Sequence, residues 1–269
     1  QYLKGTKTIP FPACRRKPPQ ERWLSIEGAR EHNLKDIDVR IPLGVFTCLT
    51  GVSGSGKSTL AEEILFRAVK MAKATPAGIP GRHRKLGGLD EIADAVMVDQ
   101  RPIARTPRAN PLTYVKAMDP IRRLLASTEA ARAMGFGPSY FSFNVTGGRC
   151  EACKGQGAEK VEMQFLSDVF ITCPECQGRR FKKEVLEVTY KGNNIRDILF
   201  MTVDQALDFF ADQRKIIDAL IPLAEVGLGY MQLGQPLNTL SGGEAQRLKL
   251  SRHLKTSGRG RVLFILDEP

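Results

Sequence analysis

The stretch Gly51–Ser58, with the sequence GVSGSGKS, decides the fold of this chain. It matches the pattern G-x-x-x-x-G-K-[ST] of a phosphate-binding loop. The run Val45–Thr50 before it is short, apolar and β-branched, which predicts a buried strand. The segment Thr59–Lys70 after it carries Leu60 and Ile64 at helical spacing. The loop is therefore expected between a strand and the start of a helix, a context that disfavours a chance glycine-rich turn.

Such a loop binds phosphate through its backbone, because glycine has no Cβ to block positive φ. The loop N–H groups and the helix N-terminus then face the anion. Lys57 is expected to reach the β- and γ-phosphates of ATP, and Ser58 to ligate Mg²⁺. The residues expected to bind the nucleotide here are Gly51, Ser53, Gly54, Ser55, Gly56, Lys57, Ser58 and Thr59.

Composition narrows the functional class. The 269 residues suffice for one large or two ordinary domains, and 42% hydrophobic residues permit a core. The net charge of +11 favours a polyanionic partner, nucleic acid before anionic lipid, although a generally basic surface would also carry it. No apolar run approaches the roughly 20 residues of a membrane helix, and no signal peptide is evident. We expect a cytoplasmic protein with no membrane partner.

Four cysteines have the spacing of a zinc site. Cys150 and Cys153 form one C-x-x-C pair, and Cys173 and Cys176 form another after 19 residues. Four thiolates complete a tetrahedral shell, so the predicted Zn²⁺ is structural. A redox-active cysteine pair is the alternative, which two matched pairs disfavour.

Polar residues follow two predicted strands. Gln100 ends the strand that begins at Ala95, where a glutamine can reach a Mg²⁺ bound to phosphate; an ordinary strand cap is an equal alternative. The apolar run Val262–Leu266 is followed by Asp267 and Glu268. Asp267 is expected to hold Mg²⁺ through water, and Glu268 to polarise the attacking water. Two acids at a strand end are common, so this prediction depends on the preceding motifs.

The pentapeptide Leu240–Glu244, LSGGE, should open a helix that runs to about Leu254. Ser241 and Glu244 form a capping-box pattern. The helix N-terminus offers a second anion site, formed by Ser241, Gly242, Gly243 and Glu244. A plain helix cap is the alternative, but the two glycines and the Gln246-Arg247 pair that follows set this segment apart.

The remaining segments follow ordinary periodicities. Strands are expected within Trp23–Ile41, at Val161–Phe165 and at Val185–Tyr190, and helices at Ile121–Met134, Thr202–Phe210 and Ile216–Val226. The proline-punctuated stretch 101–132 is rich in arginine, which suits contacts with a phosphate backbone but also an ordinary solvated face.

In order along the chain, the phosphate loop, Gln100, LSGGE and Ile265-Leu266-Asp267-Glu268 resemble the ABC-type ATPases. More specific segments resemble the UvrA family, the damage-sensing ATPases of bacterial nucleotide excision repair. These segments are Asn33–Asp36, Thr50–Leu60, Arg105–Arg108, Phe141–Asn144, Gly147–Cys153 and Thr239–Arg247. The resemblance runs from about Trp23 to Pro269. Members of that family have two ATPase halves, and this sequence matches the C-terminal half.

The resemblance implies an α/β fold: an ABC-type P-loop ATPase core with an inserted α+β signature subdomain that carries the zinc module, residues 150–176. We expect a basic linker at 1–22, the first part of the ATP-binding core at 23–105, the signature subdomain at 106–258, and the return to the core at 259–269. ATP, Mg²⁺ and Zn²⁺ are the implied cofactors. Gln100 resembles the family's Q-loop glutamine.

The resemblance also implies partners. Family members form a homodimer through their ABC domains, so that the signature helix of one domain closes over ATP held by the other. They bind damaged double-stranded DNA and load UvrB, and ATP hydrolysis tunes their preference for damaged DNA.

Some features point elsewhere. Arg101 and Ala104 stand where the family more often has serine and glycine, which suggests a divergent paralogue. The sequence ends before the family's D-loop and switch histidine, so we expect poor or no ATP hydrolysis by these 269 residues alone. An ABC ATPase of drug resistance or export is one alternative function. A zinc-stabilised binding module with a regulatory ATP site is another, which the intact motifs disfavour.

Overall fold

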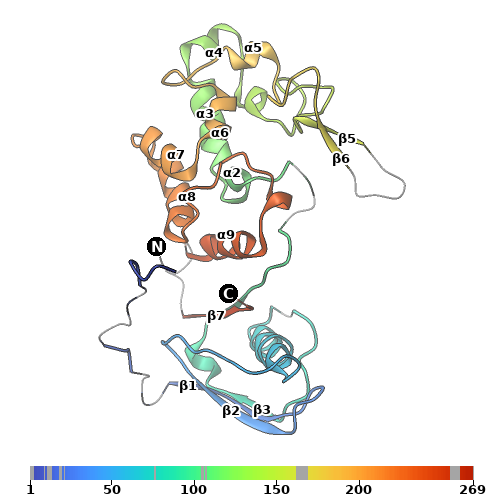
Figure 1. Ribbon diagram of the computed structural model, residues 1–269, viewed down its shortest axis with the longest axis vertical. Helices are drawn as coiled ribbons and strands as arrows, with labels where there is room; N and C mark the ends of the chain where they lie inside the picture. Colours follow the sequence, from blue (N-terminus) through green and yellow to red (C-terminus); the bar gives the residue numbers. More distant parts are fainter. Residues whose placement is uncertain are drawn as a thin grey trace. The chain divides into compact units, whose positions relative to one another are not determined.

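The computed structural model describes residues 3–8, 10, 14–17, 20, 22–75, 77–103, 106, 108–161, 169–254 and 261–268. The chain divides into two compact units (Figure 1). The first unit comprises Gln1–Met97 and Ser257–Asp267, and the second comprises Val98–Thr256 with Glu268–Pro269. Each unit contains its own cluster of buried apolar side chains.

An antiparallel sheet forms one side of the first unit. Its strand order is β2-β1-β3, with β1 at Trp23–Ala29, β2 at Ile37–Pro42 and β3 at Lys85–Gly87. Leu24 and Ile26 alternate along β1 and are fully buried. The strands expected within Trp23–Ile41 are therefore present, and their alternation places one face of β1 in the core.

The helix after the phosphate loop packs on the same core. It begins as a π-helix, η1, at Thr59–Phe66 and continues as α1 at Arg67–Ala72. Leu60, Ile64, Leu65 and Ala68 are buried. This confirms the predicted helix and its apolar face.

The strand predicted at Val45–Thr50 is wrong in this structure. Phe46 is 80% exposed and Leu49 is 49% exposed, and the segment has no strand assignment. A strand needs a hydrogen-bonded neighbour, and among the described residues no strand pairs with this segment, while β4 (Asp94–Val98) and β7 (Val262–Leu266) pair with each other. Without a partner, the apolar side chains of this segment remain outside the core.

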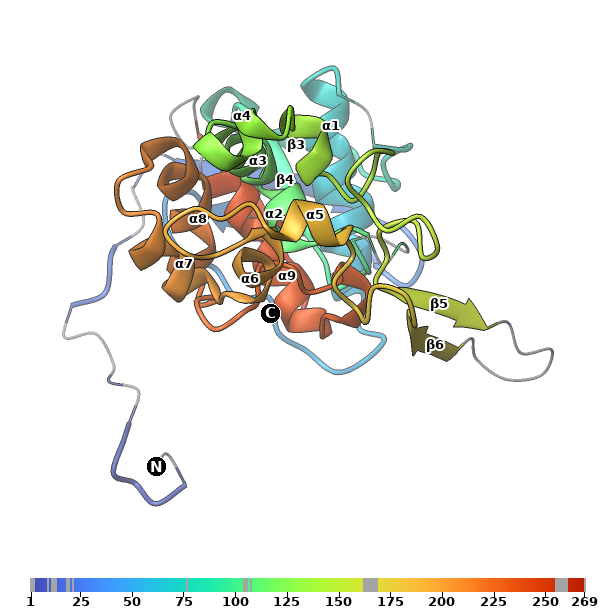
Figure 2. The ribbon, with the colours of Figure 1, turned by 90° about the horizontal axis from the view of Figure 1, so that it is seen from above.

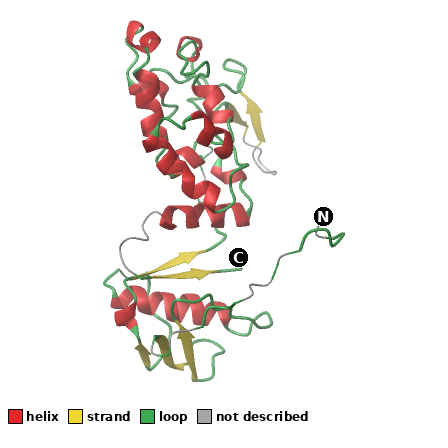
Figure 3. Cartoon of the chain, turned by 90° about the vertical axis from the view of Figure 1, so that its left-hand side faces the viewer, coloured by secondary structure: helices red, strands yellow, loops and turns green. Residues whose placement is uncertain are grey.

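The second unit is mostly helical (Figure 3). Its helices are α2 (Pro111–Tyr114), α3 (Met118–Ala126), α4 (Glu129–Ala133), α5 (Lys183–Leu186), α6 (Ile195–Phe200), α7 (Val203–Phe209), α8 (Arg214–Glu225) and α9 (Gly242–Leu254). A two-stranded antiparallel hairpin, β5 (Ala158–Val161) and β6 (Val169–Thr172), extends away from these helices (Figure 2). The strand predicted at Val161–Phe165 begins in β5, and residues 162–165 lie outside the described residues.

Short 3₁₀ turns complete the list of elements. They are η2 (Leu89–Glu91) in the first unit and η3 (Pro138–Phe141) and η4 (Leu237–Thr239) in the second. Among the described residues, no helix has both the length and the apolar character needed to cross a membrane.

Two helix predictions hold and one is modified. The helices α7 and α8 coincide with the predicted ones, and Thr202 caps α7 by accepting a hydrogen bond from the Gln205 N–H. The helix predicted at Ile121–Met134 is two helices, α3 and α4. It breaks because the Thr128 hydroxyl accepts from the Ala131 N–H and starts a new helix.

The strand predicted at Val185–Tyr190 is wrong, because α5 occupies its first half. Val185 and Val188 are both buried, at 1% and 0% exposure. Val185 lies in α5 and Val188 follows the helix, so their burial three residues apart does not have the two-residue alternation of a strand.

We expect Leu220→Ala in α8 to lower the free energy of unfolding by about 2–5 kcal/mol, because Leu220 is fully buried and its loss leaves a cavity. Its neighbour Ile221 is 38% exposed, so Ile221→Ala should cost less than about 1 kcal/mol. Urea denaturation of both variants measures the difference. Equal losses would contradict the burial pattern of α8.

Candidate nucleotide and metal sites

The phosphate-binding loop of the first unit is exposed, and side chains donate hydrogen bonds to its backbone carbonyls. Gly54 and Gly56 have φ angles of +75° and +95°, which favour glycine. A Cβ on Gly56 would come within 2.7 Å of the Leu34 side chain. The Asn33 Nδ2 donates to the Gly54 carbonyl.

The Lys57 Nζ donates to the carbonyls of Gly51, at 2.9 Å, and Val52, at 2.8 Å. The ammonium thus bonds back onto the loop backbone.

The predicted capping box at the start of α9 is present. The Glu244 carboxylate accepts hydrogen bonds from the Ser241 backbone N–H and hydroxyl, both at 2.9 Å. The Glu244 N–H donates to the Ser241 Oγ at 3.3 Å. The Ser241 N–H lowers the pKa of Glu244, since it stabilises the carboxylate.

A second set of contacts braces the same segment. The Tyr230 hydroxyl donates to Glu244 at 2.9 Å, and Arg247 donates to the Tyr230 oxygen at 3.1 Å. Arg247 also donates to the Gly227 carbonyl at 3.0 Å. The turn after α8 therefore fixes the first residues of the signature helix, a role for Tyr230 that sequence reasoning missed.

The body of α9 bonds Val98, Asp99 and Arg101 in the second unit. The Gln246 Nε2 donates to the Val98 carbonyl at 3.0 Å. The Lys249 ammonium donates to the carbonyls of Asp99, at 2.9 Å, and Arg101, at 2.7 Å, and to the Asp99 carboxylate. We call these contacts the α9 clamp. Gln246 was singled out in the sequence, but nothing in the sequence pointed to Lys249.

The clamp changes the acid–base behaviour of Asp99. Burial raises the pKa of Asp99, but the hydrogen bond and the positive charge of Lys249 lower it by more. The net effect is a lowered pKa. The pairing therefore stabilises the fold above the unfolded aspartate pKa of about 3.9. Its contribution is lost as the pH falls through the lower folded value.

Gln100 lies beside two other predicted site residues. Its Nε2 donates to the Glu268 carbonyl at 2.7 Å, and a Cβ added to Gly242 would lie 2.5 Å from its Oε1. Gln100, Gly242 and Glu268 therefore meet in the second unit. Asp267 follows β7 and is partly exposed. Gln100 groups with the second unit, although we expected it in the core at 23–105.

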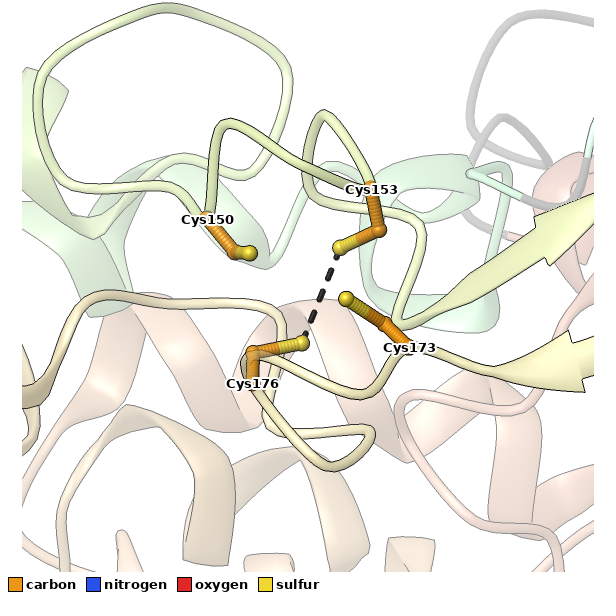
Figure 4. A group of neighbouring side chains, drawn as sticks. All are labelled: Cys150, Cys153, Cys173 and Cys176. Atoms are coloured by element: carbon orange, nitrogen blue, oxygen red, sulfur yellow. Dashed lines mark hydrogen bonds between the residues drawn. The ribbon is translucent and has the colours of Figure 1, made fainter.

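The four predicted metal ligands converge in the second unit (Figure 4). Their sulfur atoms all lie within 4.8 Å of one another, and all four side chains are buried. A tetrahedral zinc site with Zn–S bonds of about 2.3 Å places sulfurs about 3.8 Å apart, so the arrangement fits Zn²⁺. Two separate redox pairs would not need to converge. The ligands are Cys150, Cys153, Cys173 and Cys176.

Tight turns after each cysteine pair shape the cluster. Gly155 and Gly178 have φ angles of +78° and +79°. A Cβ on Gly155 would lie 2.2 Å from the Phe143 carbonyl oxygen, so only glycine fits there. The Gly157 N–H donates to the Cys153 Sγ at 3.3 Å, as is common for thiolates that bind metal.

The cluster thiols differ in how readily they ionise, as the pKa shifts of Cys150, Cys153 and Cys176 show. Burial raises the pKa of Cys150, and it raises the pKa of Cys176 to about 12. Burial also opposes the Cys153 thiolate, but the Gly157 N–H and neighbouring thiols outweigh it and lower the pKa of Cys153. A divalent cation would supply the charge that four thiolates require.

Comparisons with known proteins agree with the motifs. UvrABC system protein A of Methanothermobacter thermautotrophicus is 53% identical over 268 residues, and that of Aquifex aeolicus is 54% identical over 268 residues. Each match covers 100% of this chain, but only 28% and 29% of those proteins. A comparison with protein-family models finds no match.

A solved structure gives the same result for the fold. The crystal structure of UvrA2 from Deinococcus radiodurans aligns with a TM-score of 0.88 and 48% identity, covering 100% of this chain and 32% of that one. The α/β fold class and the resemblance to UvrA are thus confirmed along the whole chain. The chain spans less than a third of the length of the curated relatives it matches.

Cys153→Ser should reduce the zinc content of the protein from about one ion per chain to near zero and lower its melting temperature, because a closed structural site needs all four thiolates. Metal analysis and thermal unfolding measure both effects. Cys14, which is exposed and outside the cluster, provides the control: Cys14→Ser should keep the metal. Full zinc content in Cys153→Ser would exclude the four-cysteine site.

Lys249→Met should lower the free energy of unfolding by about 1–3 kcal/mol, since it leaves the Asp99 and Arg101 carbonyls without this donor and the Asp99 carboxylate paired with Arg101 alone. Lys215, an exposed residue of α8, provides the control, and Lys215→Met should have an effect within about 0.5 kcal/mol. Urea denaturation compares the two. If the two variants were equally stable, the α9 clamp would contribute nothing to the fold.

Proposed function

We propose that this chain is part of an ATP-dependent DNA-damage recognition protein of nucleotide excision repair. The observation that carries the proposal is the match of about 50% identity, along the whole chain, to proteins named UvrABC system protein A. The intact phosphate loop, signature segment and strand-end carboxylates support it. All catalytic and binding assignments below belong to this proposal.

The nucleotide-binding residues act through position and charge. Bound ATP would compete with the Gly51 and Val52 carbonyls for the Lys57 ammonium, which then contacts the β- and γ-phosphates. The hydroxyl of Ser58 and the carboxylate of Asp267, the latter through water, hold Mg²⁺. Glu268 orients and polarises the water that attacks the γ-phosphate, and Gln100 contacts the metal or its water. The other loop residues, Gly51 and Ser53–Gly56 with Thr59, surround the phosphates through backbone N–H groups and hydroxyls.

The signature segment serves the second nucleotide site of a dimer. Ser241 and Gly243 are exposed, and a Cβ on Gly243 would meet nothing within 4 Å. A phosphate of a nucleotide on another ABC domain can therefore approach the start of α9 without obstruction. The capping box and Tyr230 hold this segment in place. This exposure supports the proposed dimerisation through the ABC domains.

The nucleic-acid partner is damaged duplex DNA. The net charge of +11 supports attraction to phosphates. Recognition of chemically diverse lesions requires a readout of DNA deformability, because no base code is common to them. The four-cysteine module, holding Zn²⁺, helps present the DNA-binding surface of the second unit. Transfer of the lesion to UvrB completes the function.

The comparisons do not favour a role in drug export, since the curated relatives reported above carry the name of an excision-repair protein. The basic, cysteine-bearing insertion also stands where a transporter ATPase would contact its membrane partner. A purely regulatory ATP site would not require both strand-end carboxylates and the phosphate-loop lysine.

We expect Lys57→Ala in the full-length protein to weaken ATP binding by about 10–100-fold, because charge-assisted hydrogen bonds worth about 1.5–3 kcal/mol are lost. DNA-stimulated ATP hydrolysis should fall with it, while DNA binding without nucleotide should persist. Lys85→Ala, at an exposed position of β3, provides the control. Calorimetry and a phosphate-release assay measure these effects. Unaltered ATP hydrolysis in Lys57→Ala would reject this nucleotide site.

A further inference from the structure

Arg180 lies next to the four-cysteine cluster with most of its side chain buried. Its Nη1 is inaccessible to solvent and has no hydrogen-bond partner among the described residues. Its Nη2 donates only to the Gly234 carbonyl, at a long 3.4 Å. The guanidinium carbon lies 5.7 Å from the centre of the Phe143 ring. A buried cation with so few hydrogen bonds needs a counter-charge.

The main chain and side chain of Arg180 both contact the cysteine loops. Its carbonyl accepts a hydrogen bond from the Cys150 N–H at 2.9 Å. Its side-chain stem lies beside Gly157, where an added Cβ would come within 3.0 Å of the Arg180 Cγ. The Gly157 N–H in turn donates to the Cys153 sulfur. The guanidinium is therefore held in a fixed position beside the cluster.

The charges near Arg180 come from the cluster itself. The main chain of Arg180 bonds Cys150, and its stem lies beside Gly157, whose N–H donates to the Cys153 sulfur. No carboxylate forms an ion pair with Arg180 within the part of the chain that the structure describes. The cluster sulfurs are the counter-charge that the buried guanidinium has available.

An occupied four-cysteine site would carry a negative charge. A divalent cation bound by four thiolates carries a net charge of −2, which is costly to bury. One adjacent guanidinium reduces that cost and disfavours protonation of the thiolates. Because charged groups near metal ligands commonly change metal affinity by about 10–100-fold, the effect should be measurable.

We propose that Arg180 is the buried counter-charge of a zinc tetrathiolate formed by the four cysteines, and that it slows the release of the metal. Arg180 is a positioning residue here and contacts no nucleotide or DNA. The inference rests on the proposed zinc ion but is independent of the repair function.

The test measures the rate at which full-length protein transfers Zn²⁺ to a chromogenic chelator in excess. Arg180→Gln removes the charge but keeps a hydrogen-bond donor for the Gly234 carbonyl. Arg180→Lys keeps the charge. We expect release to be about tenfold faster in Arg180→Gln and within about threefold of the wild type in Arg180→Lys. Arg179→Gln, at the exposed neighbouring arginine, should release zinc at the wild-type rate.

Three results would overturn the inference. Equal acceleration in Arg180→Gln and Arg180→Lys would assign the effect to packing, and an unchanged rate in Arg180→Gln would remove the effect altogether. Purified wild-type protein that holds no zinc would remove the metal site as well, whatever its activity on DNA. Circular dichroism confirms that each variant is folded, and Arg180→Lys tests the charge even if Arg180→Gln is unstable.

Discussion

The second unit depends on the ammonium of Lys249. This one group joins α9 to residues 150 positions earlier in the chain by bonding the Asp99 carboxylate and two backbone carbonyls. With Gln246, it fixes Val98 and Asp99 against α9. Gln100, which follows directly, is therefore held next to Gly242. Gln100, which is expected to reach Mg²⁺, and Gly242, which is expected to contact a partner's nucleotide, therefore lie side by side in the second unit.

The cysteine cluster organises the other end of the same unit. An isolated bridge pairs Arg149 with Phe181, and the Lys182 N–H donates to the Gly148 carbonyl at 2.9 Å, so the two cysteine loops are joined where they leave the core. Phe143 and Phe181 pack edge to face beneath them, with centroids 6.3 Å apart. Zinc bound by the four cysteines would add to this core packing and fix the base of a hairpin that has little core of its own.

Local chemical patterns were predictable from sequence, and long-range pairing was not. The loop glycines, the capping box and the cysteine spacing each depend on residues close together in sequence. The structure contains the capping box and the cysteine cluster as predicted. The strand expected at Val45–Thr50 failed because a strand requires a neighbour, which local hydrophobicity does not reveal. The strand predicted at Val185–Tyr190 is wrong because a short apolar segment fits either a strand or a short helix, and periodicity alone does not distinguish the two.

Lys249 and Arg180 could not be identified from sequence alone for a related reason. Their significance comes from partners far away in the chain or from burial, and an isolated Lys or Arg in a basic sequence carries no such signal. Asn33, which holds the phosphate loop through Gly54, belonged to a segment that resembled the family, but its contact emerged only in the structure.

The central claim is that nucleotide binding controls a preference for damaged DNA. The most direct test is fluorescence anisotropy of the full-length protein with matched native and lesion-bearing duplexes, at two salt concentrations, with and without ATP. The account predicts tighter binding to the lesion duplex, by a ratio that changes with ATP and persists at the higher salt. Equal binding to both duplexes, with a steep salt dependence and no response to ATP, would show electrostatic attraction alone and contradict the claim.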